Sequence, residues 1–211
     1  MPGPLHAIVD VDMAAHAGWA PLDLACAYLA GGARLLQLRA KQLASGPLLN
    51  LCDGLVQAAA RYEASIIVND RADLAVLANA SGVHVGQDDL APADARQLLG
   101  PAAIVGFSTH TVAQIEGAIH EPISYLAVGP VFGTKTKDTG YSAVGLDLVS
   151  TAARLAGSIP VVAIGGITLE TASSVLEAGA TSVAVIGDLL AHGNPRARVA
   201  AYLQRLEKHR V

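Results

Sequence analysis

Residues 34–41 form a short apolar stretch in which every second side chain near its end is polar, namely Gln37, Arg39 and Lys41. Side chains two residues apart in a strand lie on the same face, so these three share one side of the predicted strand. Two cations and an amide are costly to bury without an anionic partner. The spacing therefore indicates a site for a phosphate-bearing ligand, although an exposed strand face or an ion pair between Arg39 and a core carboxylate fits equally well.

Acidic and amide side chains follow the next two apolar stretches. Asn69 and Asp70 come directly after the first stretch, and Asp88 and Asp89 follow the second. Carboxylates on neighbouring strands, close to a group of cations, suit Mg²⁺, which takes one or two carboxylates, water and substrate phosphate oxygens as ligands. Asn and Asp also cap helices, and we expect one of Asn69 and Asp70 to cap the helix that begins near Ala72.

Polar and glycine residues also end later stretches. Ser108 is expected to bond either a ligand or its own backbone in a local turn. Gly166 and Gly187 end the last two stretches, where backbone N–H groups can approach a phosphate closely. The sequence thus predicts two anionic sites, one at the cations and one at these glycines. His84 is expected to be either a satisfied core histidine or part of the pocket.

Eight apolar runs with helical segments between them indicate the fold class. Dividing 211 residues by 8 gives about 26 per strand and helix, near the lower limit for a closed (β/α)₈ TIM barrel. A doubly wound open sheet would ordinarily carry a G-x-G-x-x-G motif after its first strand, which is missing here. We therefore expect residues 1–211 to form a single α/β domain, a TIM barrel. The predicted strands are residues 6–10, 35–38, 65–68, 83–85, 104–107, 125–128, 160–164 and 182–186.

Local signals predict where several helices begin. Thr111 and Gln114 have the spacing of a capping box, and Pro92 suits the first turn of the helix that follows it. Thr168 can cap a helix over residues 171–178. We expect these helices to cover the outside of the barrel, which leaves the C-terminal ends of the strands as its active face.

Residues 131–145 are the one irregular segment in this pattern. They contain Gly133, Gly140 and the run Thr-Lys-Thr-Lys at residues 134–137. Loops of this length in compact domains are usually functional or disordered. We expect this one to act as a lid.

The composition excludes several classes of protein. A net charge of −4 and 4% aromatic residues argue against a surface that binds nucleic acid. No run reaches the roughly 18 apolar residues of a membrane span, and the N-terminus lacks the pattern of an export signal. Cys26 and Cys52 lack metal-ligand spacing and are expected as core residues in a reducing compartment. We therefore expect a cytoplasmic protein with small-molecule partners, with a homo-oligomer left open.

Six segments together resemble the thiamine-phosphate synthase family, in the same order and spacing over most of the chain. The resemblance implies that the hydroxymethylpyrimidine group moves from its diphosphate ester to the nitrogen of a thiazole phosphate or carboxythiazole phosphate. Thiamine phosphate forms and pyrophosphate is released. The segments are residues 37–41 (QLRAK), 69–71 (NDR), 82–89 (GVHVGQDD), 108–110 (STH), 129–137 (GPVFGTKTK) and 163–167 (AIGGI).

By the same resemblance, each motif residue takes the role of its counterpart in the family. The pyrimidine diphosphate would be held by Gln37, Leu38, Arg39, Ala40, Lys41, Asn69, Ser108 and Lys137. Four of these would also serve catalysis, namely Arg39, Lys41, Ser108 and Lys137. The cofactor Mg²⁺ would be held by Asp70 and Asp89. The thiazole phosphate would be held by Thr134, Lys135, Thr136, Gly166, Ile186 and Gly187.

The resemblance leaves two alternatives and one departure. A related family of thiazole tautomerases needs neither metal nor a diphosphate site. The presence together of Asp70, Asp89, Lys41 and Lys137 argues against it. A non-catalytic protein that binds thiamine precursors is the second alternative. At position 187 the family pattern has Ser, whereas this chain has Gly. Glycine there either removes a hydroxyl from the thiazole phosphate site or serves a backbone angle that serine cannot adopt.

Overall fold

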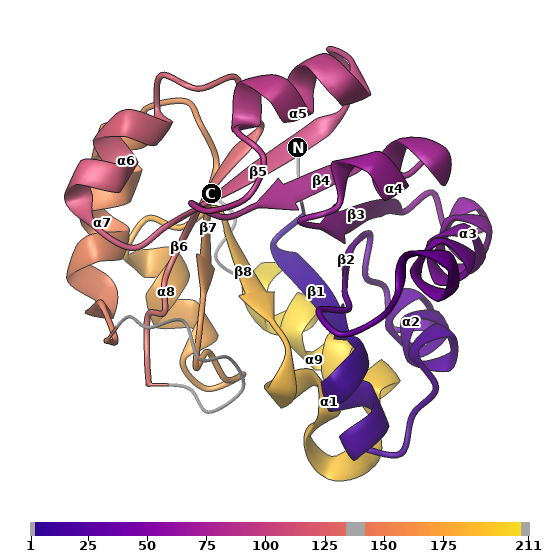
Figure 1. The fold of residues 1–211 in the computed structure, drawn as a ribbon. Coiled ribbons are helices and arrows are strands. Elements are labelled where there is room, and N and C mark those ends of the chain that lie inside the picture. Colours follow the sequence, from indigo (N-terminus) through magenta and orange to yellow (C-terminus); the bar gives the residue numbers. More distant parts are fainter. Residues whose placement is uncertain (1–2, 134–141, 208–211) are drawn as a thin grey trace.

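The computed structural model describes residues 3–133 and 142–207, and within them eight parallel strands close into a barrel (Figure 1). Each strand pairs with the next along the chain, and the last pairs with the first. Every strand coincides with a predicted run to within two residues at either end, which confirms the TIM barrel. The strands are β1 (Leu5–Asp10), β2 (Leu35–Arg39), β3 (Ser65–Asn69), β4 (Gly82–Val85), β5 (Ile104–Thr109), β6 (Tyr125–Val128), β7 (Val161–Ile164) and β8 (Ser182–Val185).

Helices connect the strands and lie outside the barrel (Figure 1). Two short elements, α1 and η1, come directly after the first and last strands and precede the outer helices. The C-terminal helix packs against β1 and α2, so the two ends of the barrel sequence are joined by helix contacts as well as by strand pairing. The helices are α1 (Val11–His16), α2 (Pro21–Ala30), α3 (Ser45–Ala60), α4 (Ala72–Leu77), α5 (Pro92–Leu99), α6 (Val112–Ala118), α7 (Gly145–Ala156), α8 (Ala172–Glu177), η1 (Gly187–Gly193) and α9 (Pro195–Glu207).

The strand side chains alternate between the packing beneath the helices and a smaller core inside the barrel. Leu36 and Leu38 of β2 belong to the large core beneath the helices, whereas Ile8 and Tyr125 belong to a smaller core inside the barrel. Both faces of a parallel sheet in this fold are covered, which explains why the predicted strands read as continuous apolar runs. Gln37 lies between Leu36 and Leu38 and therefore faces the barrel interior, where it is 3% exposed.

The helix starts confirm two of the predicted signals. Thr111 is the N-cap of α6, and its side chain accepts a hydrogen bond from the Gln114 backbone N–H. The Gln114 side chain accepts from the backbone N–H of His110, one residue before the position that a capping box prescribes. Pro92 occupies the first turn of α5, as predicted.

Two smaller predictions are wrong. The N-cap of α8 is Thr171 rather than Thr168, because residues 168–171 form a turn in which Thr171 Oγ1 accepts from the Thr168 N–H at 3.0 Å. Cys52 is buried as expected, but Cys26 is exposed on α2, a helix only part of which faces the core.

The connection from β6 to α7 is anchored at both described ends. The Val131 N–H donates to the Ile164 carbonyl at 2.8 Å, and the Gly145 N–H donates to the Val131 carbonyl at 3.0 Å. The lid predicted over residues 131–145 falls largely on residues 134–141, which lie outside the described part of the chain. The helices of the described part include none long and apolar enough to cross a membrane.

Candidate active site

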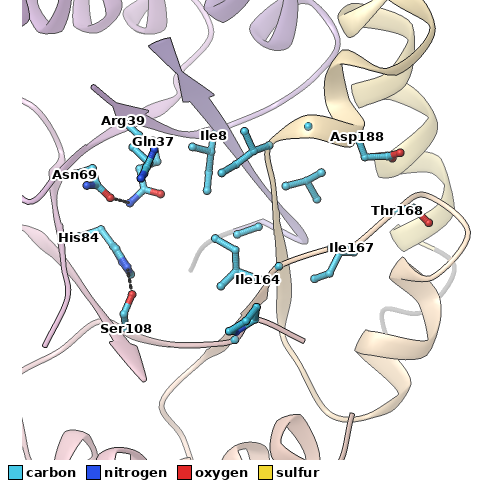
Figure 2. A pocket seen from close by; sticks show the side chains of 18 of the residues that line it. Ile8, Gln37, Arg39, Asn69, His84, Ser108, Ile164, Ile167, Thr168 and Asp188 are labelled. Atoms are coloured by element: carbon cyan, nitrogen blue, oxygen red, sulfur yellow. Dashed lines mark hydrogen bonds between the residues drawn. The ribbon is translucent and has the colours of Figure 1, made fainter. Parts of the chain in front are cut away.

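A cavity of about 450 Å³ opens at the C-terminal ends of the strands. Figure 2 shows polar side chains of β2 to β5 along one side of the cavity and Ile164, Ile167 and Thr168 toward the other. Among the predicted site residues, the cavity is lined by Gln37, Arg39, Asn69, Ser108, Gly166, Ile186 and Gly187.

Gln37 and Asn69 join the ends of two neighbouring strands. The Gln37 Nε2 group donates to Asn69 Oδ1 at 3.4 Å, across β2 and β3 (Figure 2). Because each amide orients the other, both present polar atoms along the same wall of the cavity.

Arg39 forms the ion pair that the sequence left open as an alternative. Its Nη1 atom lies 2.5 Å from Oδ2 of Asp10, a carboxylate only 2% exposed. The other Asp10 oxygen accepts from the Met13 N–H and so caps α1. Arg39 nevertheless lines the cavity, and its buried Nε has no hydrogen-bond partner among the described residues. The ion pair therefore holds the guanidinium in place without using all of its donors.

The prediction that Asn69 or Asp70 caps α4 is wrong. The N-cap is Arg71, which makes no side-chain cap bond. Asp70 has a left-handed backbone (φ 63°), and its carboxylate Oδ2 lies 2.5 Å from Lys41 Nζ. A non-glycine residue with positive φ is uncommon and concentrates at functional sites. Helix capping therefore does not account for the presence of Asn69 and Asp70 at this position.

Asp70 and Asp89 lie close together at the rim. Burial raises the pKa of Asp70, the nearby Asp89 carboxylate raises it further, and the hydrogen bond from Lys41 opposes both effects. The Asp89 carboxylate also accepts from the Gly86 N–H at 2.8 Å within its own loop. Two carboxylates that share a site favour a cation between them. No group of three or more His, Cys, Asp or Glu side chains that could hold a metal ion occurs in residues 3–133 and 142–207.

A hydrogen-bonded row runs from the barrel interior to Ser108. His84 Nε2 lies 2.8 Å from Ser108 Oγ, and His84 Nδ1 lies 2.9 Å from the hydroxyl of Tyr125. Ser108 therefore has a protein partner, and His84 is both hydrogen-bonded and part of the cavity wall. The Ser108 carbonyl also accepts from Gln87 Nε2 at 2.6 Å.

The opposite wall is built by glycines after β7 and β8. Gly165 and Gly166 have φ angles of 102° and 63°, and a Cβ at Gly166 would lie 2.7 Å from the Gly133 carbonyl oxygen. Gly187 begins η1, in which the residues with non-helical angles are Ala191 and His192. Serine can adopt helical angles, so the backbone explanation for glycine at position 187 is wrong.

Asp188 closes the far end of the cavity. Its carboxylate accepts from the Leu169 N–H at 3.0 Å, from the Tyr202 hydroxyl at 2.5 Å and from Arg198 at 2.8 Å. These bonds tie the segment after β7 and the start of η1 to α9. Asp188 thus holds the glycine wall in place.

Five predicted residues within the described part of the chain do not line the cavity. The Leu38 side chain is buried in the core beneath the helices, so only its backbone could reach a ligand. Ala40 lies just beyond the end of β2, and Lys41, Asp70 and Asp89 lie at the rim. Four predicted residues fall outside the described part of the chain, namely Thr134, Lys135, Thr136 and Lys137.

Sequence reasoning missed three side chains of this region. Tyr125 stands in a wholly apolar strand and gave no polar signal, and Asp188 resembled a surface residue of a helix start. His110 lines the cavity, and its Nδ1 atom donates to the Gly129 carbonyl at 2.5 Å. For His110 the available signal was the Gly-Pro pair after β6. For Asp188 it was its position directly after Gly187.

A family model, two relatives and one solved structure point to the same family. The family model described as thiamine monophosphate synthase matches residues 5–189. Thiamine-phosphate synthase of Koribacter versatilis is 46% identical over 204 residues, which is 96% of this chain and 95% of that protein. Thiamine-phosphate synthase of Thermus thermophilus is 43% identical over 192 residues, with coverages of 90% and 92%. The structure of thiamine phosphate pyrophosphorylase from Pyrococcus furiosus superposes with a TM-score of 0.87 at 27% identity, over 97% of this chain and 96% of that one.

Proposed function

Because the chain belongs to the thiamine monophosphate synthase family, we propose that it forms thiamine phosphate from two phosphorylated substrates. The hydroxymethylpyrimidine group would leave its diphosphate ester and bond to the nitrogen of a thiazole phosphate or carboxythiazole phosphate, with release of pyrophosphate. The observation that carries the proposal is a cavity with cationic and amide side chains on one side and a glycine wall on the other. Two anionic substrates can occupy such a cavity at once.

The diphosphate would lie on the side formed by β2 and β3. Arg39 brings a positive charge there with Nε still unpartnered in the described structure, and Lys41 brings a second charge at the rim. The amides of Gln37 and Asn69 lie along the same wall. By resemblance, Lys137 would add a third cation. Charge-assisted hydrogen bonds of this kind are the strong ones.

The carboxylates of Asp70 and Asp89 would hold Mg²⁺. Their oxygens are the ligands that this ion prefers. Burial raises the pKa of Asp70, and the neighbouring Asp89 carboxylate raises it further, a repulsion that a divalent cation would relieve. Two carboxylates leave the other ligand positions to water and diphosphate oxygens. When bound, the ion would neutralise charge on the departing pyrophosphate.

The thiazole phosphate would lie against the glycine wall. Gly166 and the start of η1 at Ile186 and Gly187 line the cavity. The first N–H groups of a helical turn lack partners within that turn and are suited to an anion. By resemblance, Thr134, Lys135 and Thr136 would complete this site.

The reaction asks the protein to stabilise charge rather than to supply a nucleophile. Pyrophosphate departs from a benzylic-type carbon with the bonding electron pair, and the thiazole nitrogen supplies the electron pair for the new bond. Arg39, Lys41 and Ser108 would stabilise the negative charge that gathers on the leaving group. Ile8 and Ile164 present apolar surface to the cavity, which keeps water from capturing the pyrimidine cation.

The test is the stoichiometric formation of thiamine phosphate and pyrophosphate. Product is expected only when the pyrimidine diphosphate, the thiazole phosphate and Mg²⁺ are all present. A thiazole tautomerase would instead convert the carboxythiazole phosphate without Mg²⁺ or the pyrimidine. A non-catalytic binding protein would bind both compounds without turnover, and either result would contradict the proposal.

A further inference from the structure

Tyr125, His84 and Ser108 form a row that leads from the barrel interior to the cavity. Tyr125 is fully buried on β6, His84 lies between the other two, and Ser108 lies at the cavity wall (Figure 2 shows the bond from His84 to Ser108). The two distances, 2.9 and 2.8 Å, are those of ordinary hydrogen bonds. Each ring nitrogen of His84 therefore has an oxygen partner, and one tautomer must satisfy both.

The burial of Tyr125 decides which tautomer this is. Burial raises the pKa of Tyr125 far above its ordinary value, so its hydroxyl keeps its proton. Within the described part of the chain, that hydroxyl bonds to His84 Nδ1. A proton on Nδ1 would make the hydroxyl oxygen the acceptor of this bond and leave the buried O–H proton without an acceptor among the described residues, which is costly. Nδ1 is therefore the acceptor.

The direction of the second bond follows from the first. A neutral imidazole with Nδ1 as acceptor carries its proton on Nε2. Nε2 then donates to Ser108 Oγ, and the hydroxyl proton of Ser108 is left for an acceptor other than His84. Because Ser108 lines the cavity, a bound ligand can supply that acceptor.

The barrel interior is shaped around this pair of rings. A Cβ at Gly106 would lie 2.1 Å from Tyr125 Cζ and 2.6 Å from His84 Nδ1, so only glycine leaves room for the contact. On the other side, His6 packs edge-on against the Tyr125 ring at 5.6 Å. Burial lowers the pKa of His6 to about 4, so it adds no charge beside Tyr125 at neutral pH.

We propose that Tyr125 is a positioning residue, which fixes the tautomer of His84 and thereby turns the Ser108 hydroxyl proton toward the pyrimidine diphosphate. The identity of that ligand rests on the proposed function, whereas the tautomer rests on the geometry alone. A donor aimed at the leaving group strengthens as negative charge accumulates there, so it stabilises the transition state more than the ground state. Ser108 would then act by donation.

The first experiment measures the tautomer directly in the unliganded protein. Long-range ¹H–¹⁵N correlation spectra of the ¹⁵N-histidine protein distinguish a protonated ring nitrogen from an unprotonated one, and a His84→Gln variant assigns the signals. At pH 8 we expect His84 to carry its proton on Nε2 and to have an unprotonated Nδ1. A proton on Nδ1, or on both nitrogens, would overturn the inference. This result does not depend on activity or on any variant of Tyr125.

The second experiment is a double-mutant cycle between Tyr125→Phe and Ser108→Ala. In the parent chain, Tyr125→Phe should lower kcat about tenfold, the effect of misdirecting one stabilising donor. The thiazole phosphate KM should stay unchanged. In the Ser108→Ala background the same change should lower kcat less than about twofold, because Tyr125 acts through Ser108. An equal loss in both backgrounds would show that Tyr125 acts otherwise and would overturn the proposal.

Tyr28→Phe is the matched control, because Tyr28 is also fully buried but lies on α2 in the core beneath the helices. Its kcat should equal that of the parent. If no variant or parent chain forms thiamine phosphate, the proposed function fails. The spectra of His84 would still decide whether the tautomer is as inferred.

Discussion

Lys41 Nζ lies 2.5 Å from Asp70 Oδ2, and Asp89 is close enough to that carboxylate to raise its pKa. Lys41 therefore pairs with a carboxylate that has a second carboxylate beside it at the rim of the cavity. The Lys41 side chain is 43% exposed, so solvent screens its attraction and weakens the pair. A divalent cation would compensate the same carboxylates better than this lysine does.

Replacement of either carboxylate should slow the reaction strongly. We expect Asp70→Asn and Asp89→Asn each to lower turnover about 10²- to 10³-fold, because an amide lacks the charge that would hold the metal. Initial rates across a Mg²⁺ series would measure this. Asp88→Asn is the control, since Asp88 is exposed beside Asp89 and has no proposed role. A parental rate for Asp70→Asn in limiting Mg²⁺ would remove that residue from the metal site.

The same Asp70→Asn change should stabilise the protein without metal. The folded pKa of Asp70 is raised, so its carboxylate lowers the free energy of unfolding at neutral pH. That penalty is absent below the unfolded pKa and appears as the pH rises through the folded pKa. The melting temperature of Asp70→Asn should therefore exceed the parental value at pH 7, and the difference should close as the pH falls toward 4. A variant that is less stable at pH 7 would contradict this sign.

His6 should make the fold sensitive to acid. Its pKa is lowered by burial from 6.5 to about 4, so its contribution to stability is complete above 6.5 and is lost as the pH falls through 4. A shift of that size corresponds to about 3 kcal/mol. Urea unfolding between pH 7 and 4 should show this loss in the parent and a smaller loss in His6→Leu. His120→Gln, at an exposed histidine, should keep the parental pH dependence.

Gly106→Ala should destabilise the barrel from within. The new Cβ would overlap the Tyr125 ring and the His84 imidazole, and overpacking of a core costs about 1–3 kcal/mol. Gly117→Ala is the control, because that glycine lies in α6 with no heavy atom within 4 Å of the new Cβ, and alanine favours a helix. The free energy of unfolding measured in urea should thus fall for Gly106→Ala and rise for Gly117→Ala. If Gly106→Ala were as stable as the parent, the Tyr125 and His84 side chains would have to shift at little cost, which would contradict the prediction.

Gly187→Ser should strengthen binding of the thiazole phosphate. The helical backbone at position 187 accepts serine, and its hydroxyl could add one charge-assisted hydrogen bond, worth roughly 1.5–3 kcal/mol at best. We expect about a tenfold lower thiazole phosphate KM with an unchanged pyrimidine diphosphate KM. A change confined to the pyrimidine KM would reverse the two proposed anion sites.

The sequence predicted the barrel well because each strand is an apolar run between helices, and this signal is local. The alternation of side chains in β2 also placed Gln37 and Arg39 toward the cavity. Contacts across the barrel could not be predicted in this way. The bond between His84 and Tyr125 joins residues 41 apart. An ion pair of Arg39 with a core carboxylate was one of the alternatives, but which carboxylate it would be could not be read from the sequence.

The wrong capping predictions have a related cause. Asn69 and Asp70 suit a helix cap by residue type, but a side chain in the neighbouring strand or loop takes each of them as a partner instead. Tertiary contacts outweighed the local preference there. Thr168 lost its predicted place because a turn precedes α8, a detail that residue type does not encode.

Gln87 links the loop after β4 to the end of β5, because its amide donates to the Ser108 carbonyl. The same loop carries Asp89, whose carboxylate is held by the Gly86 N–H. These two hydrogen bonds hold the Asp89 carboxylate and Ser108 in one connected segment of the rim. The distance between the carboxylate and the serine hydroxyl is therefore set when the chain folds. A diphosphate that bonds the serine hydroxyl directly and meets Asp89 through a metal ion would lose its own freedom on binding but would not have to organise the protein, so most of the contact energy would appear as affinity.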